Sequence, residues 1–396
     1  MNLDFMLSPD PERPGLVIRD PYHYSDATLM VPMPLVPALD CFDGEHTSLD
    51  LRSDLVRLTG RIQVSDIERN LHDSLDQAGF FENETSLRMR REKEAEFAGD
   101  SVRPAIFAGT AYPDQPDELS ELMRQRIGGA QGEASTVAIA APHASPDGGW
   151  ETYRAAYQAM PSPEAAQDMT IVILGTSHYG APDRFGLTRK PYVTPYGVAP
   201  TDVTVVDELI QGAPEAVRLE DYCHAVEHSI EFQVIFLQHL YGPSVRIVPV
   251  LCGPFVRSTY EKELPEANEH VQRFFDTAAN IAAREGKRLF WLLGVDMAHI
   301  GRRYGDRLDA RANAGEMLSV KDRDQQLIAQ LKGGDPDAYW SLIQEHQDEL
   351  KWCGASPFYT LLKILPRLKG QLLDYNQWQI DPQSVVSFGA LRFEAA

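Results

Sequence analysis

The chain has 396 residues, of which 43% are hydrophobic, enough to bury the cores of two domains. Its formal net charge of −21 repels phosphate backbones and argues against a nucleic-acid-binding protein. The sequence contains neither a signal-peptide pattern nor a run of about 20 apolar residues, so we expect a soluble, cytoplasmic protein without a membrane partner.

The first part of the chain, residues 1–95, predicts a small winged-helix-like α+β module. The expected elements are short strands at residues 16–18 and 28–31 and helices at residues 49–58 and 65–78. Thr47 or Ser48 is the expected N-cap of the first helix. In the second helix, Ser65 and Glu68 have the spacing of a capping box.

Charged side chains dominate residues 86–100, where four basic residues alternate with glutamates. Such a run is typical of a solvated linker or of the exposed side of a helix. We therefore place the domain boundary here and expect a second domain over residues 96–396.

The second domain alternates between strand and helix patterns, which predicts an α/β fold. Its central sheet should be mostly parallel or mixed, with helices on both faces. The expected strands are residues 136–141, 170–176, 245–252, 288–296, 371–378 and 384–393. The expected helices are residues 115–127, 150–160, 201–212, 227–240, 261–285, 322–332, 335–347 and 355–368. A short polar turn joins the last two strands, which favours an antiparallel hairpin.

Histidines follow the ends of three of the buried strands. His143 and His178 come after the strands at 136–141 and 170–176, and His299 follows the strand that ends at Asp296. Because the carboxyl ends of strands line the ligand site in open α/β sheets, these imidazoles are candidate ligands of a metal ion. A lone histidine at a strand end is more often a hydrogen-bonded structural residue, and the recurrence of the pattern favours the metal site.

Three further residues are candidate catalytic groups. His228 lies at the start of the expected helix at 227–240, where a carboxylate, with Glu227 and Glu231 both nearby, would orient its ring. Glu227 and Glu231 could also simply complement the helix dipole as first-turn acids. A buried Asp296 needs a partner such as a histidine N–H, or it caps the next turn. Tyr196 lies in a turn, or in a rim loop that directs it into the site.

Imidazoles with one carboxylate suit iron, zinc or copper better than magnesium or calcium, and we expect iron first. The four cysteines are scattered without CxxC spacing, which excludes a disulfide framework and a zinc knuckle. Cys353 opens a helix, and we interpret it as a buried structural cysteine. The sequence also lacks phosphate-binding glycine loops and a GxSxG nucleophile elbow.

The motifs from about residue 102 onward resemble, in order, those of the Memo family. They are Pro142-His143-Ala144, Leu174-Gly175-Thr176-Ser177-His178, Thr194-Pro195-Tyr196-Gly197, Glu227-His228-Ser229-Ile230-Glu231, Ile247-Val248-Pro249-Val250, Asp296-Met297-Ala298-His299 and Cys353-Gly354. The prokaryotic form of that family is AmmeMemoRadiSam system protein B. The resemblance implies a fold similar to class III extradiol dioxygenases of the LigB type, and partners of the radical SAM and AMMECR types.

Carried over by position, the resemblance implies that His143 and His178 are metal ligands and that His228 is the family's EHSIE histidine. The family's third ligand position, a cysteine in animal members, falls on Ala298, which cannot coordinate a metal. We therefore expect His299, Asp296 or His228 to complete the ligand set.

The first 95 residues resemble, less closely, the winged-helix fold of PqqD-like peptide-recognition modules. The resemblance implies binding of a peptide by strand addition, and a packing appendage is the equally weighted alternative.

Three functions are compatible with these expectations. The first is a non-haem-metal-dependent redox enzyme of dioxygenase-like type that acts on a small, aromatic substrate, with His228, Asp296 and Tyr196 as its catalytic groups. The second is a non-catalytic protein that binds a metal, a metabolite or a partner in a radical SAM-linked system. The third is metal-assisted hydrolysis at the same site.

Overall fold

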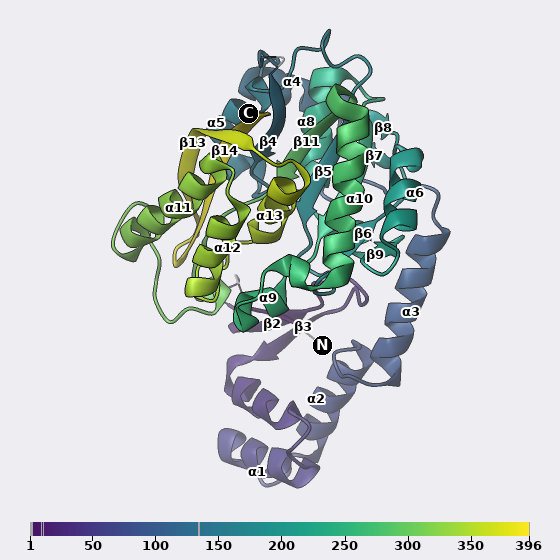
Figure 1. Ribbon diagram of the computed structural model, residues 1–396. Coiled ribbons are helices and arrows are strands. Elements are labelled where there is room, and N and C mark those ends of the chain that lie inside the picture. Colours follow the sequence, from purple (N-terminus) through teal and green to yellow (C-terminus); the bar gives the residue numbers. More distant parts are fainter. Residues whose placement is uncertain (1–2, 9, 11, 134, 396) are drawn as a thin grey trace. The chain divides into compact units, whose positions relative to one another are not determined.

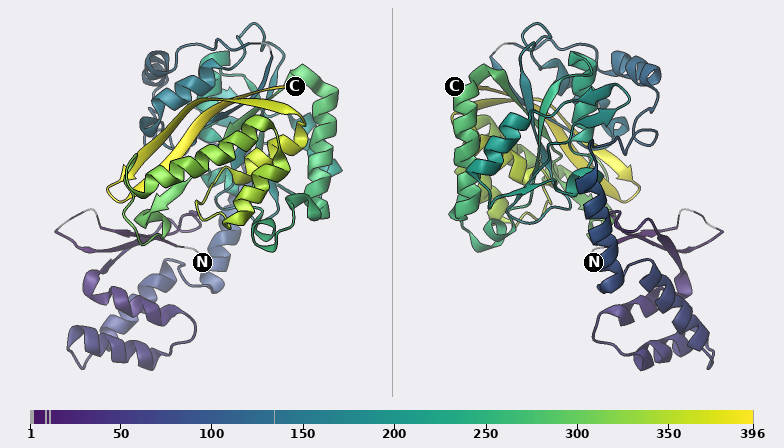
Figure 2. Two further views of the ribbon diagram at one scale, coloured as in Figure 1. Left: turned by 60° about the vertical axis from the view of Figure 1, so that its left-hand side comes forward. Right: turned by 90° about the vertical axis from the view of Figure 1, so that its right-hand side faces the viewer.

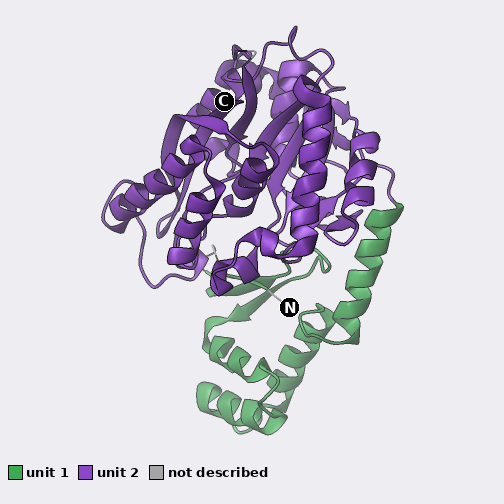
Figure 3. Cartoon of the chain, viewed as in Figure 1, with its two compact units in different colours: residues 1–99 green, residues 100–396 purple. Residues whose placement is uncertain are grey.

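The computed structural model describes residues 3–8, 10, 12–133 and 135–395. The chain divides into two compact units, residues 1–99 and 100–396 (Figure 3). The division lies at the C-terminal end of α3 (Glu84–Gly99), so the expected boundary at residue 95 falls inside this helix. The charged run is thus helical, with ion pairs at i,i+4 spacing such as Arg88–Glu92.

Unit 1 contains a three-stranded antiparallel sheet in the order β1-β2-β3 and a set of helices that follow it in sequence. The strands are β1 (Asp4–Leu7), β2 (Gly15–Arg19) and β3 (Thr28–Pro32), and the helices before α3 are the 3₁₀ helix η1 (Met33–Phe42), α1 (Ser48–Thr59) and α2 (Ser65–Gln77). Ile18 and Val31 of the sheet pack with Leu55 and Leu71 of the helices in one core. Both expected strands and both expected helices are therefore present.

The capping box of unit 1 lies on α1 and not on α2. The Thr47 hydroxyl accepts a hydrogen bond from the Asp50 N–H, and the Asp50 carboxylate accepts one from the Thr47 N–H. In α2, Val64 occupies the N-cap position and its side chain makes no capping bond. The capping box expected at Ser65 is therefore wrong: Ser65 is already inside the helix, and the Glu68 carboxylate pairs with Arg52.

Unit 2 is built on a nine-stranded mixed sheet with the order β12-β14-β4-β11-β5-β10-β6-β9, in which β13 pairs with the other edge of β14. These strands are β4 (Thr136–Ala141), β5 (Thr170–Thr176), β6 (Phe185–Leu187), β9 (Val217–Leu219), β10 (Arg246–Cys252), β11 (Leu289–Gly294), β12 (His299–Gly301), β13 (Leu368–Asp381) and β14 (Ser384–Ala395). The four central strands β4, β11, β5 and β10 are parallel, and β6 and β14 join them antiparallel. The predicted hairpin of β13 and β14 is confirmed. Strands β7 (Tyr192–Thr194) and β8 (Gly197–Ala199) pair separately.

Helices cover both faces of this sheet (Figures 1 and 2). They are α4 (Pro116–Arg126), α5 (Trp150–Gln158), α6 (Val203–Gly212), α7 (Cys223–Val226), α8 (Glu231–Tyr241), α9 (Val256–Glu261), α10 (Glu269–Glu285), α11 (Glu316–Gly333), α12 (Pro336–Glu345) and α13 (Ala355–Ile364). Because side chains alternate along a strand, Ile171 and Ile173 of β5 pack with the α4, α5 and α8 layer, and Val172 and Leu174 pack with the opposite layer. The α/β fold class is confirmed.

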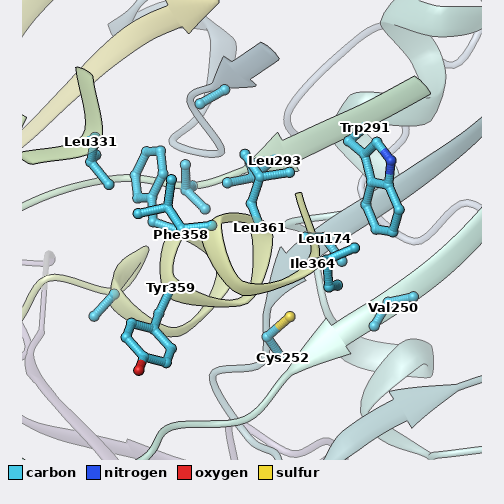
Figure 4. Close-up of a cluster of buried hydrophobic side chains, with 14 of the residues drawn as sticks. Leu174, Val250, Cys252, Trp291, Leu293, Leu331, Phe358, Tyr359, Leu361 and Ile364 are labelled. Atoms are coloured by element: carbon cyan, nitrogen blue, oxygen red, sulfur yellow. The ribbon is translucent and has the colours of Figure 1, made fainter. Parts of the chain in front are cut away.

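Helix α13 fills the second layer with apolar side chains. Leu361 and Phe358 pack with Leu174 and Leu293 of the sheet (Figure 4), and all four side chains are at most 1% exposed. Each such side chain contributes about 1.5–3 kcal/mol of burial free energy. The loop before α13 is therefore held firmly against the carboxyl ends of the strands. No helix in the described part of unit 2 or unit 1 combines the length and apolarity that a membrane span requires.

The helix predicted at 227–240 begins later than expected. Helix α8 starts at Glu231, and Glu227 has an extended backbone with φ −85° and ψ 136°. Glu227 and His228 consequently lie in a loop between α7 and α8. The expected helical spacing between these residues and Glu231 does not exist.

Candidate metal centre

Three adjacent parallel strands bring the predicted strand-end residues together. Strand β11 lies between β4 and β5, and His143, Asp296 and His178 each follow the end of one of them. The ring centroids of His143 and His178 are 5.0 Å apart. Two of the three strand-end histidines, His143 and His178, therefore lie together at the carboxyl edge of the sheet, and His299 is outside their group.

The loop between α7 and α8 adds a third imidazole. The ring of His228 stacks on that of His178 with centroids 4.9 Å apart, and it lies 5.0 Å from the ring of His143. Glycines permit this loop to come close, because a Cβ on Gly294 would meet the Ser229 carbonyl oxygen at 2.2 Å. A larger residue at the end of β11 would force the His228 loop away from the cluster.

Glu227 is a buried carboxylate that fixes the loops of two histidines. It accepts hydrogen bonds from the backbone N–H groups of His178 at 2.9 Å and of His228 at 2.9 Å, and from the His178 Nδ1 at 3.0 Å. The Nδ1 atom of His228 lies 3.2 Å from the same carboxylate. Since a carboxylate only accepts, Nδ1 of His178 carries the hydrogen and its Nε2 keeps a lone pair for a ligand.

His143 is held in the same tautomer by the backbone. Its Nδ1 donates to the Gly294 carbonyl oxygen at 2.9 Å, which leaves the Nε2 lone pair free. The Nε2 atom lies 3.4 Å from the Sγ atom of Cys353 in the loop before α13. The buried side chain, 1% exposed, is therefore fixed with its Nε2 atom toward the thiol.

The donor atoms form two overlapping groups, each within 4.8 Å. One contains His143, His178 and Cys353, and the other contains His178, Glu227 and His228. Two imidazoles and a thiol are a donor set that transition metals such as iron, copper and zinc accept. Glu227 is already engaged by three backbone N–H groups and by the His178 ring, so the first group has the freer donors.

Burial and the neighbouring charged groups shift the pKa values of the three histidines and of Glu227. Burial and the neighbouring His178 lower the pKa of His143 to about 3, and removal from water lowers the pKa of His228 to about 3. Burial acts against the charged form of His178, but Glu227 outweighs it and raises this pKa. Burial acts to raise the pKa of Glu227, yet His178 holds it well below its usual range.

The same burial, with Asp296 nearby, raises the pKa of the Cys353 thiol well above its usual range. At neutral pH, His143 and His228 are therefore neutral with free lone pairs, and Cys353 is protonated. A metal ion that binds to the thiolate has to displace this proton, so binding releases a proton.

Solvent and aromatic side chains both reach the cluster. The side chains of His178 and His228 are 27% and 28% exposed. Phe107 meets the His228 ring edge-on at 5.8 Å between centroids, and Phe232 lies 5.6 Å away. One side of the cluster is thus open to a small molecule and is bordered by aromatic rings.

The other predicted site residues lie in different surroundings. The Asp296 Oδ1 atom accepts from the backbone N–H groups of His143 and Ala144, so this carboxylate anchors the His143 loop. The Nδ1 atom of His299 faces the carbonyl oxygens of Met297 and Lys351, and its donor atoms are outside both groups.

The structure does not bring Tyr196 to the histidines. Its turn is bonded through Thr194 to Gln238, near the C-terminal end of α8, whereas His228 precedes the N-terminal end of that helix. The Tyr196 hydroxyl is buried and has no hydrogen-bond partner among the described residues. Helix α8 separates the two, because the turn packs against the amino edge of the sheet.

Arg103 and Glu231 form a buried ion pair beside the cluster that the sequence pattern did not reveal. Both side chains are 0% exposed. Arg103 also donates to the carbonyl oxygens of His224 and Glu227, each at 2.8 Å, and Glu231 also accepts from the Phe107 N–H at 3.0 Å. Of the two glutamates near His228 in the sequence, Glu227 lies beside its ring, and Glu231 holds Arg103.

Known proteins resemble this chain over most of its length. A family model described as a Memo-like protein matches residues 103–392. A MEMO1 family protein of Aquifex aeolicus is 26% identical over 382 residues, 95% of each chain, so this alignment extends into unit 1. MEMO1 family proteins of Thermus thermophilus and Desulfurococcus amylolyticus are 26% and 29% identical, covering 78% and 74% of this chain and 86% and 98% of those proteins.

Proposed function

The chain belongs to the Memo-like family, and we propose that His143, His178 and Cys353 bind a transition metal ion at which a small substrate reacts. The single observation that carries this proposal is the convergence of the two imidazoles and the thiol within 4.8 Å. Cys353 supplies the sulfur donor that Ala298 cannot. The expected third ligand, His299, is replaced in the proposal by this cysteine.

The donor set fits the ion chemically. Iron, copper and zinc accept two imidazoles and a thiolate, and hard ions such as magnesium do not. When bound, iron or copper supplies redox chemistry, and zinc supplies Lewis-acid chemistry. The backbone carbonyl of Gly294 and the carboxylate of Glu227 each accept the Nδ1–H of one imidazole, so Nε2 is the ring nitrogen that would bind an ion. Because Glu227 outweighs burial and raises the pKa of His178, an ion that binds there would displace a proton.

In this proposal His228 is the acid/base group for the substrate. Burial lowers its pKa to about 3, so its ring is neutral at pH 7 and keeps the lone pair that a proton acceptor needs. Its partial exposure lets a substrate atom reach it, and the half-buried Phe107 beside it provides a surface on which a phenolic or other aromatic ring stacks. Asp296 holds the His143 loop through its Oδ1 atom.

Two alternatives use the same site. Metal-assisted hydrolysis requires the ion and a water molecule, and it does not require a redox-active metal. A non-catalytic component of a radical SAM-linked system would bind a metal, a metabolite or an AMMECR-type partner without turnover. The identity of the bound metal distinguishes metal-assisted hydrolysis from the redox enzyme.

The metal content of the purified protein tests the ligand set. We expect about one equivalent of metal, iron first, in protein prepared anaerobically without a histidine tag. Measured by elemental analysis, this metal should be lost in His143→Ala and in Cys353→Ser. The matched control His299→Ala should retain it, because its donor atoms lie outside the group.

If Cys353→Ser retained the metal and His299→Ala lost it, the third ligand would be His299 and not Cys353. Iron together with turnover of phenols or catechols would support the redox enzyme, and zinc would support hydrolysis. Folding of each variant is checked by its thermal unfolding, so that loss of metal is not mistaken for loss of structure.

We also propose that unit 1 binds an extended peptide of a partner protein. Strand β3 is an edge strand, and no described strand pairs with its outer edge. Beside it lies a groove of about 340 Å³ between Met30 and Val31 of β3 and Ile67 and Leu71 of α2. An open strand edge next to an apolar groove suits strand addition, in which backbone bonds give affinity and the groove takes alternate side chains.

Hydrogen exchange with the radical SAM partner tests this second proposal. We expect the outward-facing amides among residues 28–31 to gain protection when the purified radical SAM protein of the same organism is added. Leu71→Asp should abolish the protection, because a charge in the groove cannot be solvated there. Ile62→Asp is the matched control: Ile62 is 91% exposed and lies outside the groove. Equal protection in both variants would overturn the proposal.

A further inference from the structure

A second cavity lies at the edge of the sheet opposite the histidines. It has a volume of about 370 Å³ and is lined by residues at the amino ends of strands, including Thr136 of β4, Met169 before β5 and Leu289 of β11. The end of α13 and the start of β13 close it with Leu365 and Leu368. The volume and apolar walls are those of a small-molecule site.

One polar atom in the wall of this cavity has no partner. Thr136 is 4% exposed, and its Oγ1 atom makes no hydrogen bond within the described residues. A buried hydroxyl without a partner costs about 1–3 kcal/mol, so native proteins seldom leave one unsatisfied. The atom is covered by its surroundings, so a ligand oxygen would satisfy it once the Thr136 side chain turns toward the cavity.

A cationic side chain lines the same cavity. Lys287, in the turn after α10, is exposed and has no ion-pair partner in the described part of the chain. The neighbouring Arg288, by contrast, pairs with Glu285. The chain as a whole has a net charge of −21, but here an unpaired ammonium group lies beside an apolar cavity. A positive charge at this place favours a ligand with an anionic head group.

We propose that this cavity binds an amphiphilic monocarboxylate, with its apolar body between the strand ends and α13. The carboxylate pairs with the Lys287 ammonium group and accepts a hydrogen bond from the Thr136 hydroxyl. The site is separate from the metal centre, because the strands place the two at opposite ends of the sheet. The proposal therefore does not depend on the function of the histidine cluster.

Calorimetric titration of the full chain with decanoate tests the proposal, with decanol as the neutral probe. We expect decanoate to bind, Lys287→Gln to weaken it about threefold and Thr136→Val to weaken it about fivefold. Lys287→Gln should leave decanol binding unchanged. Ala165→Trp, which fills the cavity from an exposed loop position, should abolish both, and Ala165→Ser is its size-matched control.

His143→Ala should bind decanoate as the unmodified chain does, because it alters only the metal centre. The proposal is overturned if decanoate does not bind, or if Ala165→Trp binds it with unchanged affinity. Equal weakening of decanoate and decanol by Lys287→Gln would also overturn it, since the ammonium group would then not recognise the carboxylate. Thermal unfolding of each variant confirms that it is folded.

Discussion

At the scale of single residues, Glu227 organises the candidate centre. It is fully buried, and its two oxygens accept bonds from two backbone loops and from the ring of His178. A buried carboxylate is stabilised only when such donors replace water. The result is a preorganised pair of imidazoles, so metal binding need not wait for a change of tautomer.

Glu227→Gln should weaken metal binding by about 10–100-fold. The glutamine amide has one oxygen in place of two, and its NH₂ group would face either the His178 Nδ1–H or a backbone N–H. That N–H group would lose its acceptor, and the His178 ring would turn away. Competition with a chromophoric chelator measures the affinity, and ¹⁵N NMR of the imidazoles reports the tautomer. Glu261→Gln, an exposed change on α9, is the control. Unchanged affinity together with an unchanged His178 tautomer would contradict the role assigned to Glu227.

At the scale of elements, Asp324 ties α11 to the two loops behind the centre. Its carboxylate accepts bonds from Trp352 Nε1 at 2.6 Å and Ser387 Oγ at 2.6 Å, and from the Tyr375 hydroxyl at 2.7 Å. Trp352 immediately precedes Cys353. Ser387 of β14 in turn accepts a bond from the backbone N–H of Ala298, in the loop after β11. Packing of α11 on the sheet therefore fixes both the Cys353 loop and the Ala298 loop.

Asp324 also predicts a pH dependence of stability. Burial raises its pKa to about 6, although the three hydrogen bonds act to lower it, against 3.8 for the ordinary group. Because the folded state binds this proton more tightly, the Asp324 contribution to the free energy of unfolding falls as pH rises from about 4 to about 6. The loss amounts to at most about 3 kcal/mol and is complete above pH 7.

Urea unfolding of the unmodified chain and of Asp324→Asn between pH 4 and pH 7 measures the contribution of Asp324 to the free energy of unfolding. The difference in unfolding free energy between the two should change across the window, with the unmodified chain losing stability relative to the variant. Asp322→Asn, an exposed change on the same helix, should give a constant difference. A constant difference for Asp324→Asn as well would show that Asp324 does not titrate in this range.

At the scale of the whole molecule, the chain contains two units that each have their own core. Leu55 in unit 1 and Leu293 in unit 2 are both 0% exposed, and they belong to separate hydrophobic clusters. Units with separate cores unfold as separate cooperative steps when neither depends on the other.

Scanning calorimetry should therefore resolve two unfolding transitions. Leu55→Ala should lower the stability of one by about 2–5 kcal/mol, and Leu293→Ala should do the same to the other. The metal should stabilise only the transition that Leu293→Ala affects, because every proposed ligand lies in unit 2. A single transition that both variants shift equally would show that the units unfold together.

The sequence by itself determined the α/β class, the strand ends and the two histidines that follow them. These features are local: apolar runs such as residues 136–141 and 170–176 predict buried strands, and the residue after a parallel strand lies at its carboxyl edge. The family assignment also rested on motifs that are contiguous in the sequence, and the match to residues 103–392 confirmed it.

Only the tertiary structure decided the rest of the centre. Cys353 is 210 residues from His143, and Arg103 is 128 residues from Glu231, so no local pattern connects them. Glu227 lies outside the helix that its apolar neighbours predicted, because its carboxylate accepts N–H groups from a distant strand end as well as from its own loop. The position of Cys353 beside His143, the contact of Glu227 with His178 and the remote position of Tyr196 all depend on how the loops pack. Long-range packing is the information that sequence periodicity lacks.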